Sequence, residues 1–425
     1  MNKFLLNLKL PGLATIFFLA LILRLAISVP FYSGDVNNHI VWGRSLAEDG
    51  FIGFYDRQHP NVVFPTYGPF GMIPFGASFF FFIFLVNFIW FLNLSIPPFP
   101  SNLVYFFSSE NYNLLAATMK LSAIVGDLLV GLFIYFFAAH ILKVKNPKIF
   151  TILYLFNPAV FYLSANWGQF DSLVLAFALA SVYFIFVKRP FLSSSFFAAS
   201  LLTKQTAVFF GPVFYILFLK TLGLKKTLLS VAISALILYF SYLPFGFLNP
   251  TNTFSFYFQT FFYVTDRVTE NAFNLWYFVF APGKPFDFEI FAGITHKIWG
   301  YLAFAIFAIP ALFPLFKKIN PKQVLTVLAF FLLASFLLLT RMHERYLAFL
   351  LPFPLLLSFN SPNFLWIYFG LSLIHLLNLY NGFFQPNIPI FNSLVGNLIL
   401  VKLMIVLLFG ILAYFGFKIF KYVKA

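Results

Sequence analysis

Cysteine is absent from this 425-residue chain, and charged residues make up only 9% of it. The absence of cysteine excludes a disulfide framework and any thiolate metal site. The scarcity of charge, with 61% hydrophobic residues and a mean hydropathy of +0.91, excludes a globular domain that dissolves in water. Apolar runs of about 20 residues recur instead, each long enough to cross a hydrocarbon core of about 30 Å. Because the ten-residue alternation of an outer-membrane barrel is missing, we expect an all-α polytopic membrane protein.

Acidic residues are also few, 12 against 27 lysines and arginines, which leaves a net charge of +15. In a water-soluble protein this charge would suggest nucleic acid, but in a membrane protein it marks the loops that stay inside. We therefore predict that membrane lipid surrounds this chain and that the chain does not bind nucleic acid. The basic clusters predicted to be cytoplasmic are Lys3/Lys9, Lys143/Lys145/Lys148, Lys188/Arg189, Lys220/Lys225/Lys226, Lys317/Lys318/Lys322 and Lys418/Lys421/Lys424.

The first apolar run, residues 10–29, has the length of a signal peptide, but it contains Arg24 and lacks a small-residue cleavage site. We interpret it as an uncleaved first span. Three apolar stretches separate the first two basic clusters, and three crossings would put Lys143 outside the membrane. The middle stretch, near residues 70–95, is therefore predicted not to cross.

On this interpretation residues 30–113 form one long outer loop that contains juxtamembrane or re-entrant helices. The result is about twelve transmembrane helices with both termini cytoplasmic, whereas thirteen spans would leave the basic clusters on opposite sides. We expect an integral, multi-pass membrane protein, in the plasma membrane if the source is prokaryotic. Residues 1–245 would form a catalytic transmembrane module, and residues 246–425 a second module with an outer loop at 246–297. The outer segments on this map are 30–113, 166–171, 203–205, 246–297, 341–346 and 381–393.

Eleven of the twelve acidic residues fall on the predicted outer side, so candidate chemistry is sought there. Asp35 follows the first span and is either a solvated carboxylate that helps to end the helix or a general base at the membrane surface. Its position alone favours neither. Asp127, the twelfth acidic residue, lies within an apolar span about two helical turns beyond Lys120. An intramembrane carboxylate indicates function, but an ion pair with Lys120 is a structural explanation of equal weight.

Two further groups of polar residues interrupt the apolar spans on the same side. Trp167, Gln169 and Asp171 lie together between two spans, and because a plain turn does not need these three side chains, a functional site is favoured. Lys204 and Gln205 interrupt the next pair of spans.

The densest polar group is residues 341–346, with the sequence Arg-Met-His-Glu-Arg-Tyr. Its two guanidinium groups and its imidazole could bind a phosphate, or the charged side chains could form a network that only tethers the outer turn. A metal is less favoured than a phosphate, because no ligand spacing such as His-Glu-x-x-His occurs. We predict neither a metal nor a cofactor.

In their order along the chain, these groups resemble the GT-C superfamily of membrane glycosyltransferases. The residues that carry the resemblance are Gly34-Asp35, Tyr67-Gly68-Pro69, Ile-Val-Gly-Asp-Leu-Leu at 124–129, Asn157-Pro158, Asn-Trp-Gly-Gln-Phe-Asp-Ser at 166–172, Lys204-Gln205, Asn-Ala-Phe-Asn-Leu-Trp at 271–276 and Met-His-Glu-Arg-Tyr at 342–346. The match covers about residues 30–350. Within the superfamily the chain is similar to glucosyltransferases of the endoplasmic reticulum that use dolichyl-phosphate glucose, and to bacterial mannosyltransferase-like proteins. One motif differs, since Tyr-Gly-Pro at 67–69 stands where the family has Tyr-Pro-Pro.

The resemblance implies an inverting glycosyltransferase that moves a hexose from a polyprenyl-phosphate donor to a hydroxyl acceptor on the outer membrane face. The acceptor would be a glycan, a glycolipid or a protein. By the same resemblance, Asp35 is the catalytic base and His343 lies near the donor phosphate. With Arg345 and Lys204, His343 would supply positive charge to the leaving phosphate.

The remaining polar residues of these motifs are predicted to bind substrate or to shape the site: Tyr67, Asp127, Trp167, Gln169, Asp171, Gln205 and Glu344. The isoprenoid tail of the donor is expected in a lipid-facing groove lined by Phe and Leu.

A lipid or sugar transporter, or a flippase, is the alternative function. Such a protein should show repeated halves with paired broken helices and charges at the membrane midplane. Here the polar groups gather at one face and the two halves do not look alike. A purely structural membrane protein would explain the hydrophobicity but not the ordered outer motifs.

Overall fold

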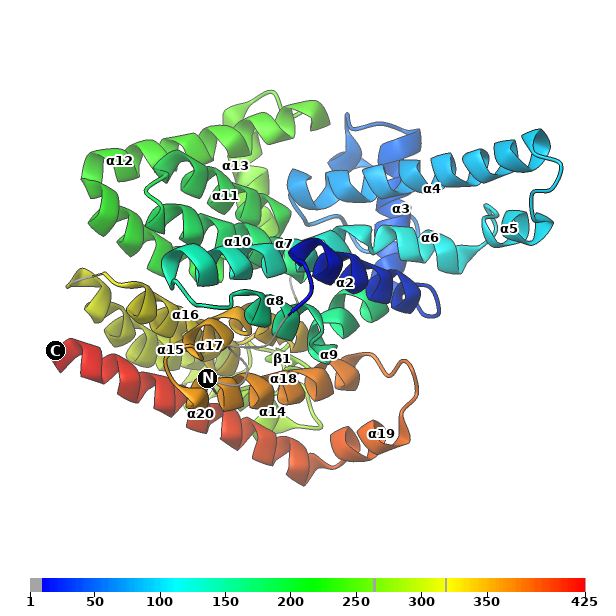
Figure 1. Ribbon diagram of the computed structural model, residues 1–425. Coiled ribbons are helices and arrows are strands. Elements are labelled where there is room, and N and C mark those ends of the chain that lie inside the picture. Colours follow the sequence, from blue (N-terminus) through cyan, green and yellow to red (C-terminus); the bar gives the residue numbers. More distant parts are fainter. Residues whose placement is uncertain (1–9, 263–264, 318, 425) are drawn as a thin grey trace.

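The computed structural model describes residues 10–262, 265–317 and 319–424, and it is almost entirely helical (Figure 1). This confirms the predicted all-α class. The predicted basic residues Lys3, Lys9 and Lys318 lie outside the described residues.

Twelve of the helices precede residue 260: α2 (Leu13–Ser28), α3 (Gly34–Glu48), α4 (Pro69–Ser95), α5 (Ser101–Phe106), α6 (Tyr112–Met119), α7 (Leu121–Phe136), α8 (Lys148–Leu155), α9 (Pro158–Phe161), α10 (Asp171–Phe186), α11 (Pro190–Thr203), α12 (Gly211–Tyr242) and α13 (Pro250–Gln259). The later helices are α14 (Leu275–Phe280), α15 (His296–Leu312), α16 (Pro321–Leu338), α17 (Pro352–Leu357), α18 (Pro362–Gly382), α19 (Pro389–Gly396) and α20 (Leu398–Lys424). Short 3₁₀ or π segments are η1 (Phe54–Asp56), η2 (Phe137–Ile141), η3 (Tyr162–Trp167), η4 (Gln205–Phe210), η5 (Leu243–Phe245), η6 (Thr260–Phe262), η7 (Phe313–Phe316) and η8 (Glu344–Leu350). The two-residue strands are β1 (Thr269–Glu270), β2 (Ile290–Phe291), β3 (Ile294–Thr295) and β4 (Met342–His343).

Local sequence signals begin several of these helices. The side chains of Ser33, Asn157 and Asn320 each accept a hydrogen bond from a backbone N–H in the first turn of α3, α9 and α16. A proline follows each of the two asparagines at the first helical position, where its missing N–H costs nothing. These three helix starts are thus encoded in the local sequence.

Seven described helices are long and apolar enough to cross a membrane, and an eighth joins them if the bent pair α8 and α9–η3 counts as one span. The chain is accordingly a multi-pass membrane protein. α2, α10 and α11 are apolar as well but shorter. The count of twelve spans stays a prediction.

α12 is two helices joined at Gly223. This glycine has a φ of 76°, in the left-handed region that other residues avoid, and the backbone there is not helical. Figure 1 shows the two halves of α12 meeting at an angle at the left edge of the molecule. The break lies within the predicted cytoplasmic cluster Lys220/Lys225/Lys226, so each half of α12 is a candidate span of its own.

α4 corresponds to the stretch that was predicted not to cross. It has 27 residues and is one of the seven helices with sufficient length and apolar character. It begins beside the end of α11, where a Cβ on Gly68 would lie 2.3 Å from the carbonyl oxygen of Leu202. From there α4 packs on α6 and extends away from the other helices to α5 (Figure 1). Its length permits a crossing, and its assignment to the outer loop remains a prediction.

Of the two explanations that the sequence left open for Asp127, the ion pair with Lys120 is wrong. Seven helical residues separate the two by about 10 Å along the axis, more than a lysine side chain spans. Asp127 instead pairs with Arg24 of α2, at 2.7 Å, and accepts a hydrogen bond from Ser164. The Lys120 ammonium donates to backbone carbonyl oxygens at the ends of α2 and η3, among them those of Ser28 and Asn166.

The largest hydrophobic core includes residues of both predicted modules, from Ile16 to Ile419. α10 packs against α7 and α11, while α16 packs against α15, α17 and α20. The division at residue 245 stays a prediction, and the segments that follow the C-terminal ends of α11 and α16 line the cavity described next.

Candidate active site

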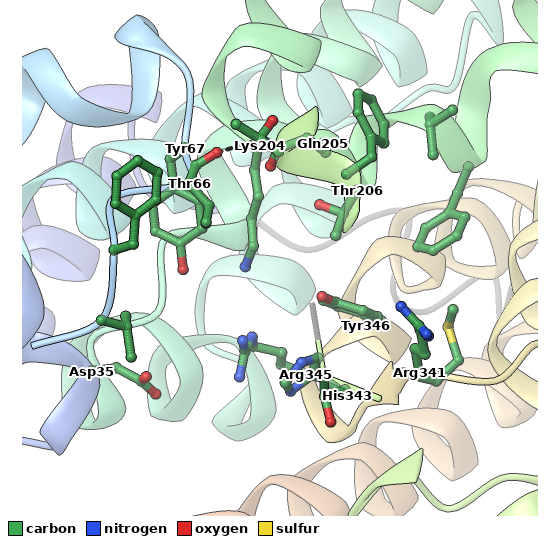
Figure 2. Close-up of a pocket in the computed structure, with 18 of the residues that line it drawn as sticks. Asp35, Thr66, Tyr67, Lys204, Gln205, Thr206, Arg341, His343, Arg345 and Tyr346 are labelled. Atoms are coloured by element: carbon green, nitrogen blue, oxygen red, sulfur yellow. Dashed lines mark hydrogen bonds between the residues drawn. The ribbon is translucent and has the colours of Figure 1, made fainter. Parts of the chain in front are cut away.

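A cavity of about 680 Å³ lies where these segments meet residues of α3, of the segment before α4 and of the loop after α13 (Figure 2). Six of the predicted site residues line it: Asp35, Tyr67, Lys204, Gln205, His343 and Arg345. They come from four separate regions of the sequence. Figure 2 shows Asp35 at one end, the Lys204 and Arg345 side chains in the middle, and Arg341 toward the other end.

Asp35 lies in the first turn of α3, where the positive end of the helix dipole favours a carboxylate. Its side chain is half-buried and accepts a hydrogen bond from the amide of Gln169. The hydroxyl of Ser33, which caps the same helix, donates to the carbonyl oxygen of Trp167 at 3.0 Å. The residues at 167–169 therefore fix both the start of α3 and the carboxylate that it carries.

Lys204 reaches into the cavity from the end of α11. Its ammonium donates to Oδ1 of the buried Asp171 at 2.9 Å. The same ammonium lies 5.4 Å from the ring centre of Tyr67, 5.5 Å from that of Phe170 and 5.7 Å from that of Tyr346. Aromatic faces attract a desolvated cation, so one carboxylate and three rings together fix this charge.

Arg345 brings the second buried cation to the same carboxylate. Its Nε lies 3.6 Å from Oδ2 of Asp171, and its Nη1 donates to Glu344 at 3.2 Å. Neither the Nε nor the Oδ2 has a hydrogen-bond partner among the residues that the structure describes. Asp171 thus holds Lys204 closely and Arg345 loosely.

His343 lines the cavity from β4, which pairs in parallel with β1 of the outer loop 246–297. Burial, with the neighbouring charges of Arg345, Lys204 and Lys284, lowers the pKa of the imidazole well below its usual value. The ring is therefore neutral at physiological pH. It offers hydrogen bonds to a ligand, whereas the sequence led us to expect a positive charge.

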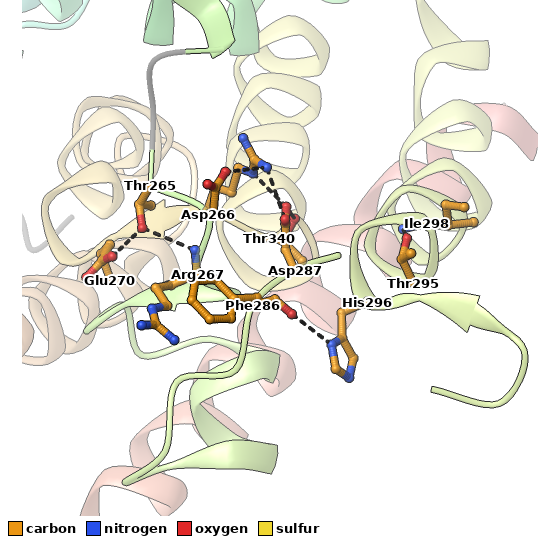
Figure 3. Close-up of polar contacts among 11 residues, drawn as sticks. Thr265, Asp266, Arg267, Glu270, Phe286, Asp287, Thr295, His296, Ile298 and Thr340 are labelled. Atoms are coloured by element: carbon orange, nitrogen blue, oxygen red, sulfur yellow. Dashed lines mark hydrogen bonds and ion pairs between the residues drawn. The ribbon is translucent and has the colours of Figure 1, made fainter. Parts of the chain in front are cut away.

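Arg341 is held by the outer loop. Its guanidinium pairs with the buried Asp287 at 2.6 and 3.0 Å, and with Asp266 at 3.0 Å. Figure 3 shows Asp266, Asp287 and Thr340 gathered around this contact. The tethering role that the sequence left open for residues 341–346 therefore applies to Arg341, while Arg345 faces the cavity.

The other predicted residues support the cavity or lie outside it. The Gln205 amide donates to the carbonyl oxygen of Thr66 and to the hydroxyl of Thr260. Trp167 is 5% exposed, stacks on Phe383 and does not line the cavity. Asp127 does not line the cavity.

Sequence reasoning missed several lining residues, among them Asn38, Thr66 and Asp266. Asn38 follows Asp35 by three residues, so helical periodicity could have placed it on the same face. Asp266 gave no such signal, because only the folding of the loop 246–297 brings it to the cavity.

A second, apolar cavity of about 270 Å³ lies between α11, both halves of α12 and α13. It shares two lining residues, Val208 and Phe261, with the first cavity. Among the described residues, no group of three or more His, Cys, Asp and Glu is arranged to hold a metal ion. No known family model matches the sequence, and no curated protein matches it either.

Proposed function

We propose that this protein is an inverting glycosyltransferase that moves a hexose from a polyprenyl-phosphate donor to a hydroxyl acceptor. The observation that carries the proposal is the arrangement of the cavity. A half-buried carboxylate, Asp35, lies at one end, two buried cations lie in the middle, and an apolar groove adjoins through Val208 and Phe261.

In the proposed reaction the acceptor hydroxyl attacks the anomeric carbon from the face opposite the phosphate. The new C–O bond forms as the bond between that carbon and the phosphate oxygen breaks, and the hydroxyl proton passes to the Asp35 carboxylate. One displacement inverts the anomeric centre. The leaving polyprenyl phosphate takes the bonding electrons, and fixed cations stabilise its charge without a protonating acid.

The cations suit a donor with a single phosphate. Lys204 and Arg345 already share Asp171, and Arg341 is occupied by Asp287 and Asp266. Because Arg345 also pairs with Glu344, these contacts leave no net positive charge, so a diphosphate, which carries more negative charge than a monophosphate, would be balanced less well. The neutral His343 can donate a hydrogen bond to a phosphate oxygen.

The apolar groove provides a place for the isoprenoid tail. Its lining includes Phe197, Leu201, Leu238 and Phe258 from α11, α12 and α13, which agrees in kind with the expected Phe and Leu. An apolar chain gains free energy by leaving water for such a surface.

The proposed topology has twelve spans and an outward-facing cavity. Its spans are α2, α6 with α7, α8 with α9 and η3, α10, α11, the two halves of α12, α15, α16, η8 with α17, α18, and α20. With α4 in the outer loop, the described basic clusters all fall at the cytoplasmic ends of these segments, and the cavity residues fall at the other ends.

The test is to incubate purified protein in lipid vesicles with hexoses linked to a polyprenyl phosphate, to a polyprenyl diphosphate or to a nucleotide. We expect sugar transfer, or slow hydrolysis, from the monophosphate donor alone. Release of sugar only from a nucleotide donor would overturn the donor assignment. Movement of a labelled lipid across the vesicle membrane with its sugar intact would instead favour a flippase.

A further inference from the structure

Asp171 contacts both buried cations of the cavity but is not among the cavity-lining residues. It is the first residue of α10, and its side chain is fully buried. Its position behind Lys204 and Arg345 leaves no room for an acceptor hydroxyl on the carboxylate. Asp171 is therefore unsuited to act as a base, which leaves that role to Asp35.

We propose that Asp171 is a positioning residue that orients Lys204 and Arg345 and also limits how tightly they hold a phosphate, so that the product lipid phosphate can leave. This inference rests on the proposed function. The carboxylate then has two effects: it weakens the binding of phosphate, and it speeds turnover.

The orienting effect follows from the contacts. Lys204 is a flexible side chain whose ammonium is held by Oδ1 and by three aromatic rings. Arg345 is held on one side by Glu344 and approached on the other by Oδ2. Without the carboxylate, two like charges would face each other in a buried site and would move apart. A misplaced cation stabilises the leaving phosphate less well.

The limiting effect follows from charge. A phosphate that enters between Lys204 and Arg345 must share them with Asp171 and is repelled by it. The Oδ2 atom and the Arg345 Nε, 3.6 Å apart and unpaired among the described residues, show that the carboxylate does not saturate the guanidinium. The cations therefore keep some capacity for an anionic ligand, and the negative charge beside them reduces its affinity.

The test compares binding of farnesyl phosphate with turnover in Asp171→Asn, which keeps the size of the side chain and removes its charge. We expect the Kd for farnesyl phosphate to fall about tenfold, because a buried unit charge a few ångströms away acts strongly on a ligand charge. We expect kcat to fall by about tenfold or more, with KM lowered or unchanged. A carboxylate with a merely structural role would weaken both binding and turnover.

Asp127→Asn is the matched control, because it neutralises another buried, ion-paired aspartate that lies outside the cavity. It should leave the Kd within about twofold of the parent.

If Asp171→Asn fails to fold, Asp171→Glu keeps the charge and displaces it, and should lower kcat about tenfold while leaving the Kd within about threefold. Equal or weaker binding of farnesyl phosphate to Asp171→Asn, or a Kd changed about tenfold in Asp171→Glu, would overturn the inference. Failure of the parent protein itself to bind farnesyl phosphate would instead remove the proposed function.

Discussion

Asp35 lies at the end of the cavity beyond the two cations, and in the proposed reaction it is the base that takes the proton of the acceptor hydroxyl. Replacing it by Asn keeps its size and its contact with Gln169 while removing the proton acceptor. We expect Asp35→Asn to fold, to bind donor normally and to transfer sugar about 10²- to 10⁴-fold more slowly, which is the usual effect of losing a general base. The measurement is the initial rate of transfer at saturating donor. A rate within about threefold of the parent would show that another group takes the proton.

Arg345 should act on the donor phosphate. Its guanidinium lines the cavity, and a charge-assisted contact contributes about 1.5–3 kcal/mol. Arg345→Ala is therefore expected to weaken donor binding roughly tenfold to a hundredfold. Arg44→Ala, at an exposed pair with Glu48 on α3, is the control and should leave donor affinity unchanged. Weakened acceptor binding with normal donor affinity would reverse the assignment.

His39, one helical turn after Asp35, links the stability of the outer loop to pH. The imidazole is 2% exposed and stacks on Phe75 of α4 at 4.1 Å. Burial lowers its pKa to about 3, against the opposing charge of Asp35. Because the unfolded chain takes up a proton below about pH 6.5 and the folded one does not, stability is fully present above that pH and is lost as the pH falls.

We expect this histidine alone to cost about 2 kcal/mol of unfolding free energy between pH 6.5 and pH 5. His39→Phe keeps a ring against Phe75 and cannot titrate, so it should lose less stability over that range than the parent. Thermal unfolding of both proteins at pH 7 and pH 5 measures the difference. Equal losses in the two proteins would contradict the assignment.

At the residue scale, the sequence predicted several of the polar side chains that line the cavity, but not how these side chains pair. Asp35, Lys204, His343 and Arg345 were found because polar residues are costly in an apolar chain and stand out. The partner of Asp127 was mistaken because Lys120 was the nearest cation in the sequence, whereas Arg24 is 103 residues away and is brought close only by folding. For the same reason the sequence could not predict that Asp171 joins Lys204 to Arg345.

At the scale of elements, charge patterning predicted a turn within α12 that hydropathy alone does not indicate. The 41-residue apolar segment Gln205–Phe245 reads as one span by length and composition, yet Gly223 breaks its long helix α12 in two. The lysines around that glycine indicated a cytoplasmic turn before the break was seen. α4 shows the converse, because none of its 27 residues carries a charge from which to assign its ends to a side of the membrane.

The absence of cysteine from the chain permits a direct test of topology, since an introduced cysteine is the only thiol. Lys226→Cys, in the turn of α12, should resist an impermeant thiol reagent in intact cells, because the turn is predicted to be cytoplasmic. Ser109→Cys, after α5, should be labelled. Both positions are exposed on the protein surface, so a failure to react reports the membrane and not burial. Labelling at Lys226→Cys without labelling at Ser109→Cys would contradict the map, and it is the result expected if α4 crosses the membrane behind a cytoplasmic N-terminus, because that crossing moves both positions to the opposite side. Labelling at neither would mean that an even number of spans, and not the proposed odd number, separates the two positions.

At the scale of the whole molecule, the distribution of carboxylates bears on whether a divalent metal takes part. The carboxylates near the cations are paired: Asp171 with Lys204, Glu344 with Arg345, and Asp287 with Arg341. Within the described parts of the chain, no three acidic, histidine or cysteine side chains come together as a metal site would require. In the proposed reaction, side chains that the fold holds in place stabilise the charge on the leaving phosphate instead of a metal ion. We therefore expect transfer to continue, within about twofold, when EDTA is in excess over all divalent ions. The measurement is the rate of transfer from a polyprenyl-phosphate donor before and after chelation. A loss of about tenfold or more that Mg²⁺ or Mn²⁺ restores would mean that donor or acceptor brings a metal into the cavity, and that Lys204 and Arg345 do not suffice to stabilise the phosphate.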